Sequence, residues 1–72
     1  MEYYYEQIVP TEHYLYHHAK DMPWTDVLRI MIITKNRRKK GDVFEIETDE
    51  HYIVFAVRDR TAFVINAKRK RQ

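Results

Sequence analysis

The chain has 72 residues, no cysteine and a formal net charge of +2. This length predicts a single domain over residues 1–72, because two independent hydrophobic cores need a longer chain. The lack of cysteine excludes disulfides, cysteine-ligated zinc sites and cysteine nucleophiles. No apolar run approaches the roughly 20 residues of a membrane-spanning helix, and residues 1–9 show no signal-peptide pattern. We therefore expect a soluble cytoplasmic protein without a membrane partner, and we expect no cofactor.

Positive charge is concentrated in the second half of the chain. Residues 1–34 carry two basic and five acidic side chains, a net −3, whereas residues 35–72 carry eleven basic and six acidic side chains, a net +5. Nine of the thirteen basic residues fall in two runs, which are Lys35, Arg37, Arg38, Lys39 and Lys40, and then Lys68, Arg69, Lys70 and Arg71. The high charged fraction, with a single glycine, is also typical of proteins from thermophiles.

The first third of the chain predicts a strand and two helices. Residues 3–9 are rich in tyrosine and β-branched side chains and precede Pro10, which favours an extended edge strand. Thr11 is a suitable N-cap for a helix over residues 12–20. A second helix over residues 23–34 is predicted from a proline in its first turn and from a buried stripe at i, i+3, i+4 and i+7, formed by Trp24, Val27, Leu28 and Met31.

Three strands are predicted after Gly41, the only glycine. Residues 44–48 alternate between apolar and polar side chains, the period of a half-buried strand. Residues 51–57 are apolar on both faces, as in a central strand, and residues 61–67 form the third. The order predicts an α+β fold in which two N-terminal helices pack on a three-stranded antiparallel meander, with an extra N-terminal edge strand. Residues 67–72 either extend the last strand or form a frayed basic tail.

Two histidines are candidates for chemistry. His13 and His17 lie four residues apart and share a helix face, a spacing that suits one metal ion, with Glu12 or His51 as a third ligand. Ordinary half-buried histidines show the same pattern, and we expect no metal. One of the pair could instead be the general base or acid of a metal-free ribonuclease, with Tyr52, Arg58 and Arg60 assisting. The sequence favours ordinary surface residues over catalytic ones at these positions, so an enzyme is the weaker hypothesis.

The two basic runs give the leading functional hypothesis. If they converge in the fold, they form a surface for a polyanion, whose phosphates bind with an affinity that falls as salt rises. Nearby tyrosines could stack on bases. We therefore expect a small RNA- or DNA-binding domain whose contacts are Lys35, Arg37, Arg38, Lys39, Lys40, Arg58, Arg60, Lys68, Arg69, Lys70 and Arg71. The alternative is that these residues only solvate a loop and a tail.

The N-terminal tyrosines give a second hypothesis. Tyr3, Tyr4 and Tyr5 would lie on an edge strand, whose unpaired backbone groups can extend the sheet of a second copy or of a partner. The same residues could equally complete the sheet of this chain. A protein-interaction or homodimerisation module is thus the main alternative to nucleic-acid binding.

The layout resembles small prokaryotic domains of unknown function related to the RelE and BrnT toxins. The resemblance covers nearly the whole chain from Thr11 and rests on the order of THE-YLYHHAKD-MPWTDVLRI, a basic linker, GDVFEIE, HYIVFAV and TAFVINAKRK. It implies a compact helix-helix-meander unit, RNA cleavage and neutralisation by an antitoxin-like protein. His13, near the start of the first helix, is the one residue that it carries over. The chain departs from the toxins in its shortness and in lacking a clear catalytic set on its strands.

Overall fold

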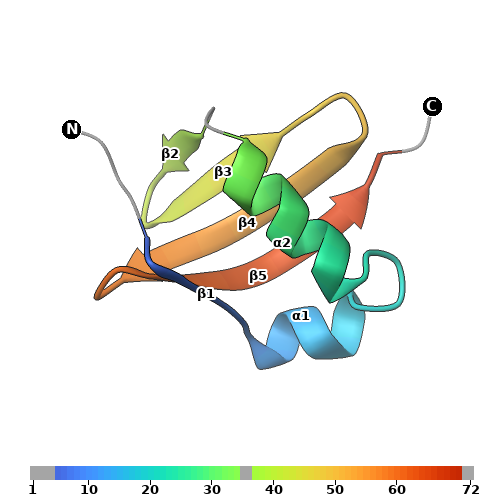
Figure 1. Cartoon of the computed structure of the whole chain (residues 1–72), viewed down its shortest axis with the longest axis horizontal. Coiled ribbons are helices and arrows are strands. Elements are labelled where there is room, and N and C mark those ends of the chain that lie inside the picture. Colours follow the sequence, from blue (N-terminus) through green and yellow to red (C-terminus); the bar gives the residue numbers. More distant parts are fainter. Residues whose placement is uncertain (1–4, 35–36, 71–72) are drawn as a thin grey trace.

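A computed structural model describes residues 5–34 and 37–70 of the chain. Its elements are β1 (Gln7–Pro10), α1 (Glu12–His17), α2 (Trp24–Ile33), β2 (Arg38–Lys40), β3 (Val43–Glu47), β4 (His51–Arg58) and β5 (Thr61–Arg69). The strands form one sheet in the order β1-β5-β4-β3-β2. β1 runs parallel to β5, and the other neighbours are antiparallel. α2 crosses one face of the sheet, and α1 lies beside β5 (Figure 1).

The predicted three-stranded antiparallel meander is wrong, because the sheet is mixed and has five strands. β2 was missed because its three residues are all basic and exposed, so no apolar alternation marks it. It is held by pairing with β3 across the turn at Gly41, whose φ of +64° suits glycine. The N-terminal strand is shorter than predicted and pairs in parallel with β5, where Pro10 is tolerated on an edge.

The helices begin near the predicted residues, but α1 is shorter than expected. Thr11 caps α1, since its hydroxyl oxygen accepts a hydrogen bond from the Tyr14 amide at 3.3 Å. The same hydroxyl donates to the Val64 carbonyl of β5 at 2.7 Å, which ties the start of α1 to the sheet. α1 ends at His17 instead of residue 20. Within residues 5–34 and 37–70, no helix combines the length and the apolar content needed to cross a membrane.

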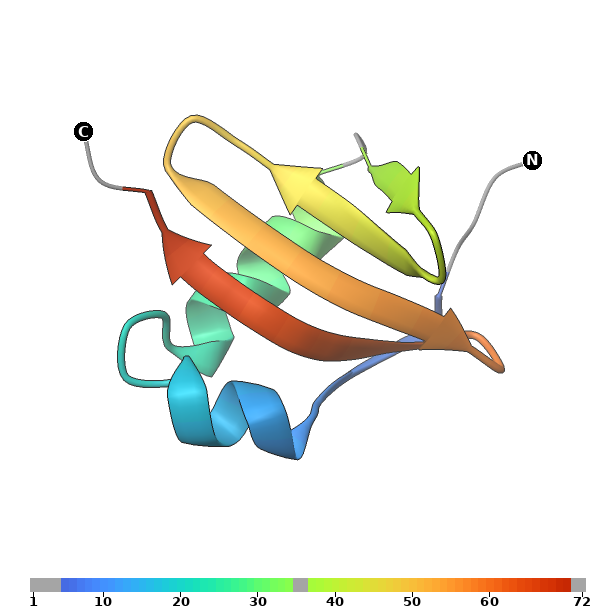
Figure 2. The same cartoon turned by 180° about the vertical axis from the view of Figure 1, so that it is seen from behind.

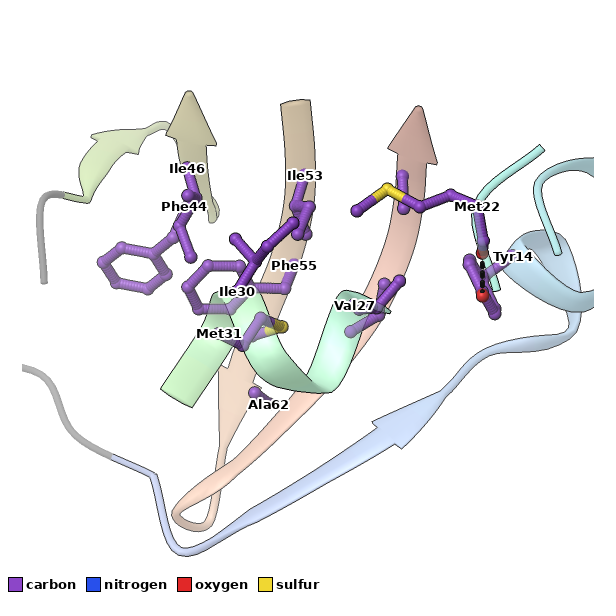
Figure 3. Close-up of a cluster of buried hydrophobic side chains, with 12 residues drawn as sticks. Tyr14, Met22, Val27, Ile30, Met31, Phe44, Ile46, Ile53, Phe55 and Ala62 are labelled. Carbon is purple, nitrogen blue, oxygen red and sulfur yellow. Dashed lines mark hydrogen bonds between the residues drawn. The ribbon is translucent and has the colours of Figure 1, made fainter. Parts of the chain in front are cut away.

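The core lies between α2 and the sheet (Figure 3). On α2 the buried residues are Val27, Ile30 and Met31. They pack against alternating residues of the sheet, namely Phe44, Ile46, Ile53, Phe55, Ala62, Val64 and Ala67. Tyr14 of α1 and Met22 close one end of the core, and the Tyr14 hydroxyl donates to the Met22 carbonyl at 2.5 Å. The core is therefore built from the side chains on one face of the central strands, and the side chains on the other face point away from it.

Among the described residues, no helix lies on the sheet face opposite α2, and we call it the open face (Figure 2). Side chains alternate along a strand, so residues between the core positions point to this face. Strand register places Val54 opposite Glu45, Ala56 opposite Phe63, and Phe63 beside Val9 of β1. The open face thus has a half-buried apolar centre that no element of the described chain covers.

Candidate nucleic-acid interface

The open face combines an aromatic and apolar centre with a basic rim. The register places five basic and two acidic side chains on this face. These are Arg38, Lys40, Arg58, Lys68 and Lys70, against Glu45 and Glu47. Tyr52 and Phe63 contribute the aromatic rings, and both are half-buried. A positive surface that also carries aromatic rings suits a polyanion with flat bases.

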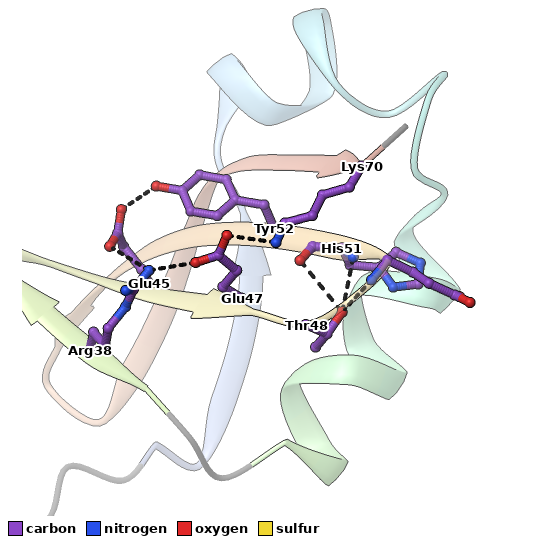
Figure 4. Close-up of polar contacts among 8 residues, drawn as sticks. Arg38, Glu45, Glu47, Thr48, His51, Tyr52 and Lys70 are labelled. Atoms are coloured by element: carbon purple, nitrogen blue, oxygen red, sulfur yellow. Dashed lines mark hydrogen bonds and ion pairs between the residues drawn. The ribbon is translucent and has the colours of Figure 1, made fainter. Parts of the chain in front are cut away.

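The two basic runs meet on the open face at Glu47. Arg38 of β2 lies 2.7 Å from Oε1 of Glu47, and the Lys70 ammonium lies 2.6 Å from Oε2 of the same carboxylate (Figure 4). β2 and β5 are not neighbours in the sheet, so this carboxylate bridges the two strands across β3 and β4. The convergence expected of a shared basic surface is therefore present, with an acidic residue at its centre.

The pKa values of Glu47 and Tyr52 are shifted in opposite directions by their neighbours. The hydrogen bond and charge of Lys70, with a smaller contribution from Arg38, lower the pKa of the Glu47 carboxyl. Tyr52 donates its hydroxyl to Glu45, and this bond, followed by desolvation, raises the pKa of Tyr52. The Lys68 ammonium lies 5.6 Å from the centroid of the Tyr52 ring, within cation–π range. Lys68 and Tyr52 are thus in contact with each other on the open face.

Not all of the predicted contacts share this face. Lys39 is paired with the core residue Phe44, so it alternates away from the open face. Arg37 stacks on the Tyr5 ring at 4.8 Å, Arg60 lies 3.5 Å from Glu6, and Arg69 lies 3.1 Å from Asp26 of α2. Among the ion pairs of residues 5–34 and 37–70, none involves Lys40, Arg58 or Lys68. Lys35 and Arg71 lie outside the described residues.

The histidines form a cluster on and just after α1. The ring centroids of His13 and His17 are 4.8 Å apart, and His18 lies 5.2 Å from His13. Burial lowers the pKa of His18, the Asn66 side chain opposes this, and His13 and His17 lower it further. In the described part of the chain, no three metal-binding side chains are arranged to hold an ion. α1 lies beside β5 (Figure 2), and His18, which follows α1, interacts with the side chain of Asn66 on β5.

Tyr5 packs against the core. Its hydroxyl donates to the Met31 carbonyl at 2.8 Å, and its ring meets Phe55 edge to face at a centroid distance of 5.6 Å. Burial raises the pKa of Tyr5, and the charge of Arg37 opposes this. Tyr3 and Tyr4 lie outside the described residues. The interface role of the three tyrosines stays a prediction.

A pocket that was not predicted from the sequence lies between α2, the start of β4 and the end of β5. It is lined by Asp26, Arg29, Ile30, Glu50, His51, Arg69 and Lys70. Arg69 and Lys70 were predicted as nucleic-acid contacts, and His51 was predicted only as a metal ligand. Arg29 had no predicted role. Arg29 is the one basic residue of the helix predicted over residues 23–34. No local pattern in the sequence indicates that α2 places it near the end of β5.

Comparisons of this chain with protein-family models, with curated proteins and with solved structures find no match. The resemblance to RelE- and BrnT-related domains therefore stays a prediction.

Proposed function

We propose that the chain binds single-stranded RNA on the open face. The observation that supports this most is the meeting of the two basic runs at Glu47, which puts Arg38 and Lys70 on one surface. The five basic side chains of this face exceed its two acidic ones, and each phosphate that they neutralise releases counterions and adds affinity.

The centre of the open face supports a single strand over a duplex. Phe63 and Tyr52 have half-buried rings on this face, with Lys68 over the ring of Tyr52, and unpaired bases could stack on these rings. Each stacked base contributes about 1–3 kcal/mol of binding free energy. Bases in a duplex are already stacked on each other and cannot use these rings.

Binding by this surface is largely independent of base identity. Ring stacking and phosphate contacts accept any base, and sequence readout needs hydrogen bonds to base edges. The predicted RNA cleavage and the toxin-like role would require a catalytic group beside the bound phosphates. His13 and His17 contact each other and His18 beside β5, so this proposal is limited to binding.

The test measures fluorescence anisotropy of a labelled single-stranded RNA of about ten nucleotides at several salt concentrations. The logarithm of the association constant should fall linearly with the logarithm of salt, with a slope of about −0.7 for each phosphate neutralised. Replacement of both Lys40 and Lys68 by Gln should make the slope shallower. Lys20→Gln removes one positive charge just after α1, half of the change in the double variant, and should leave the slope unchanged.

A second pair of variants separates stacking from charge. Phe63→Leu keeps an apolar side chain but removes the ring, and it should weaken binding by about 5- to 100-fold if one base stacks there. Tyr16→Leu removes an 81% exposed ring from α1 and should have no effect. Absence of salt-dependent binding, or equal affinities for the Phe63→Leu and Tyr16→Leu variants, would overturn the proposal.

A further inference from the structure

The pocket at the end of β5 is almost entirely lined by charged or titratable side chains. It has a volume of about 600 Å³, and Ile30 is the single apolar residue in its lining. Three of its residues are basic, namely Arg29 of α2, Arg69 at the end of β5, and Lys70 directly after β5, whose ammonium is bound to Glu47 on the open face. His51 adds an imidazole from the start of β4. Asp26 and Glu50 are the acidic members. This composition suits a small multivalent anion better than an apolar ligand.

We propose that this pocket binds a phosphate monoester. Resting on the RNA-binding function proposed above, the inference is that the pocket takes the terminal phosphate of a strand that lies on the open face. A monoester carries a charge of about −1.5 to −2 at neutral pH and offers three acceptor oxygens. An internal phosphodiester carries only one charge, so the two guanidinium groups of Arg29 and Arg69 favour the end of the strand.

The geometry of Arg69 supports an anion site. Its guanidinium lies 3.1 Å from Oδ2 of Asp26, which holds one side of its planar donor fork toward α2. A guanidinium has five N–H donors, so a carboxylate on one side leaves donors for a phosphate oxygen on the other. Arg29 and His51 take part in no ion pair among the described residues, so both are available to the same anion.

Lys70 connects this pocket to the open face. It lines the pocket, and its ammonium lies 2.6 Å from Glu47 on the open face. Its backbone amide donates to the Glu50 carbonyl at 2.8 Å, which fixes the end of β5 beside the start of β4. Arg69 faces α2, on the other side of the sheet from Lys68 and Lys70. A strand that follows β5 over these two lysines would have to pass around the end of β5 to bring its last phosphate to Arg69.

The experiment compares one short RNA with three kinds of ends: a 5′-phosphate, a 3′-phosphate, and hydroxyls at both ends. An internal label allows anisotropy measurements on all three, and inorganic phosphate and adenosine monophosphate serve as competitors. We expect one phosphorylated form to bind at least tenfold more tightly than the hydroxyl form. Arg29→Gln should abolish this difference while leaving the affinity of the hydroxyl form unchanged, and Lys20→Gln should preserve it.

Removal of the acidic residue Asp26 should change the preference for a phosphorylated end in the direction opposite to Arg29→Gln. Asp26→Asn deletes a negative charge from the pocket and should increase the preference for the phosphorylated end, whereas a purely structural role of the Asp26–Arg69 pair would decrease it. Perturbation of the His51 imidazole resonances by adenosine monophosphate in wild-type protein, and not in Arg29→Gln, would place the anion in the pocket.

The outcomes separate this inference from the proposed function. Equal affinities for all three RNAs would overturn the inference and leave RNA binding intact. No binding of any RNA, together with saturable effects of phosphate or adenosine monophosphate on His51, would overturn RNA binding and support a site for free phosphate monoesters. No effect of any phosphorylated molecule on His51 or on RNA affinity would overturn the inference.

Discussion

Glu47 lies between the two basic runs and limits the positive charge that the open face can offer to RNA. Its carboxylate pairs with Arg38 at 2.7 Å and with Lys70 at 2.6 Å. Both partners are consequently less available for phosphates than a count of basic residues suggests. An RNA phosphate has to displace this carboxylate or share its partners.

Replacement of Glu47 by Gln should strengthen RNA binding. The change removes the charge that pairs with Lys70 and Arg38, while Arg38 keeps its second partner Glu45 at 3.6 Å. We therefore expect a several-fold higher affinity at low salt and a steeper salt dependence. Anisotropy titrations of wild-type and Glu47→Gln protein at two salt concentrations measure both effects. Glu12→Gln makes the same charge change in the first turn of α1, away from the open face, and should alter neither. Weaker RNA binding by Glu47→Gln would argue against phosphate contacts on this face.

At the scale of elements, α1 is held to the rest of the molecule by Thr11 and Tyr14. Thr11 bonds to the Val64 carbonyl of β5, and Tyr14 is fully buried with its hydroxyl on the Met22 carbonyl. α1 has six residues, too few for a helix that is stable by itself. Its position therefore depends on these tertiary contacts.

Tyr14→Phe should destabilise the fold measurably. The change removes one hydroxyl and leaves a buried carbonyl without that donor, which costs about 1–3 kcal/mol of unfolding free energy. Urea unfolding followed by far-ultraviolet circular dichroism measures the difference. Tyr16→Phe, on the same helix but 81% exposed, should change the free energy by less than about 0.5 kcal/mol. Equal stabilities of the two variants would show that the Tyr14 hydrogen bond is not needed to fix α1.

The helices and strands that carry a local sequence signal were predicted correctly as elements. Thr11 and Pro23 mark helix starts by backbone chemistry, and the alternation around Ile46 marks β3, because these signals act between near neighbours. β2 carries no such signal, since three exposed basic residues look the same in a loop and on an edge strand. Its pairing with β3 is a property of the folded backbone.

Long-range pairing was the part that sequence could not supply. β1 lies parallel to β5, which comes from the other end of the chain, and no local pattern encodes that partner. The candidate site depends on the same information: Glu47 was predictable as an outward residue, but its bridge between Arg38 and Lys70 follows from strand order. The same holds for the pocket, where Arg29 comes near Arg69 only through the packing of α2.

At the scale of the whole molecule, acid should destabilise the fold in two steps. Burial lowers the pKa of His18 below its usual 6.5, so in the folded protein this group resists protonation, while in the unfolded chain it takes up a proton. Stability should therefore be full above about pH 6.5 and fall as the pH drops below that value. Lys70 and Arg38 lower the pKa of Glu47 below 4.5, so its contribution is full above that value and is lost as the pH falls further.

Urea unfolding at pH 7.5, 5.5, 4.5 and 3.5 tests this order, and two variants assign the steps. His18→Gln should flatten the decrease between pH 7.5 and 5.5, and Glu47→Gln should flatten part of the decrease below pH 4.5. Salt distinguishes the two causes, because it screens the exposed pairs of Glu47 but hardly changes the burial of His18. The lower step should thus shrink in 1 M salt while the upper step persists. A wild-type stability that is constant from pH 7.5 to 5.5, or an upper step that disappears in salt, would show that burial of His18 does not couple folding to pH.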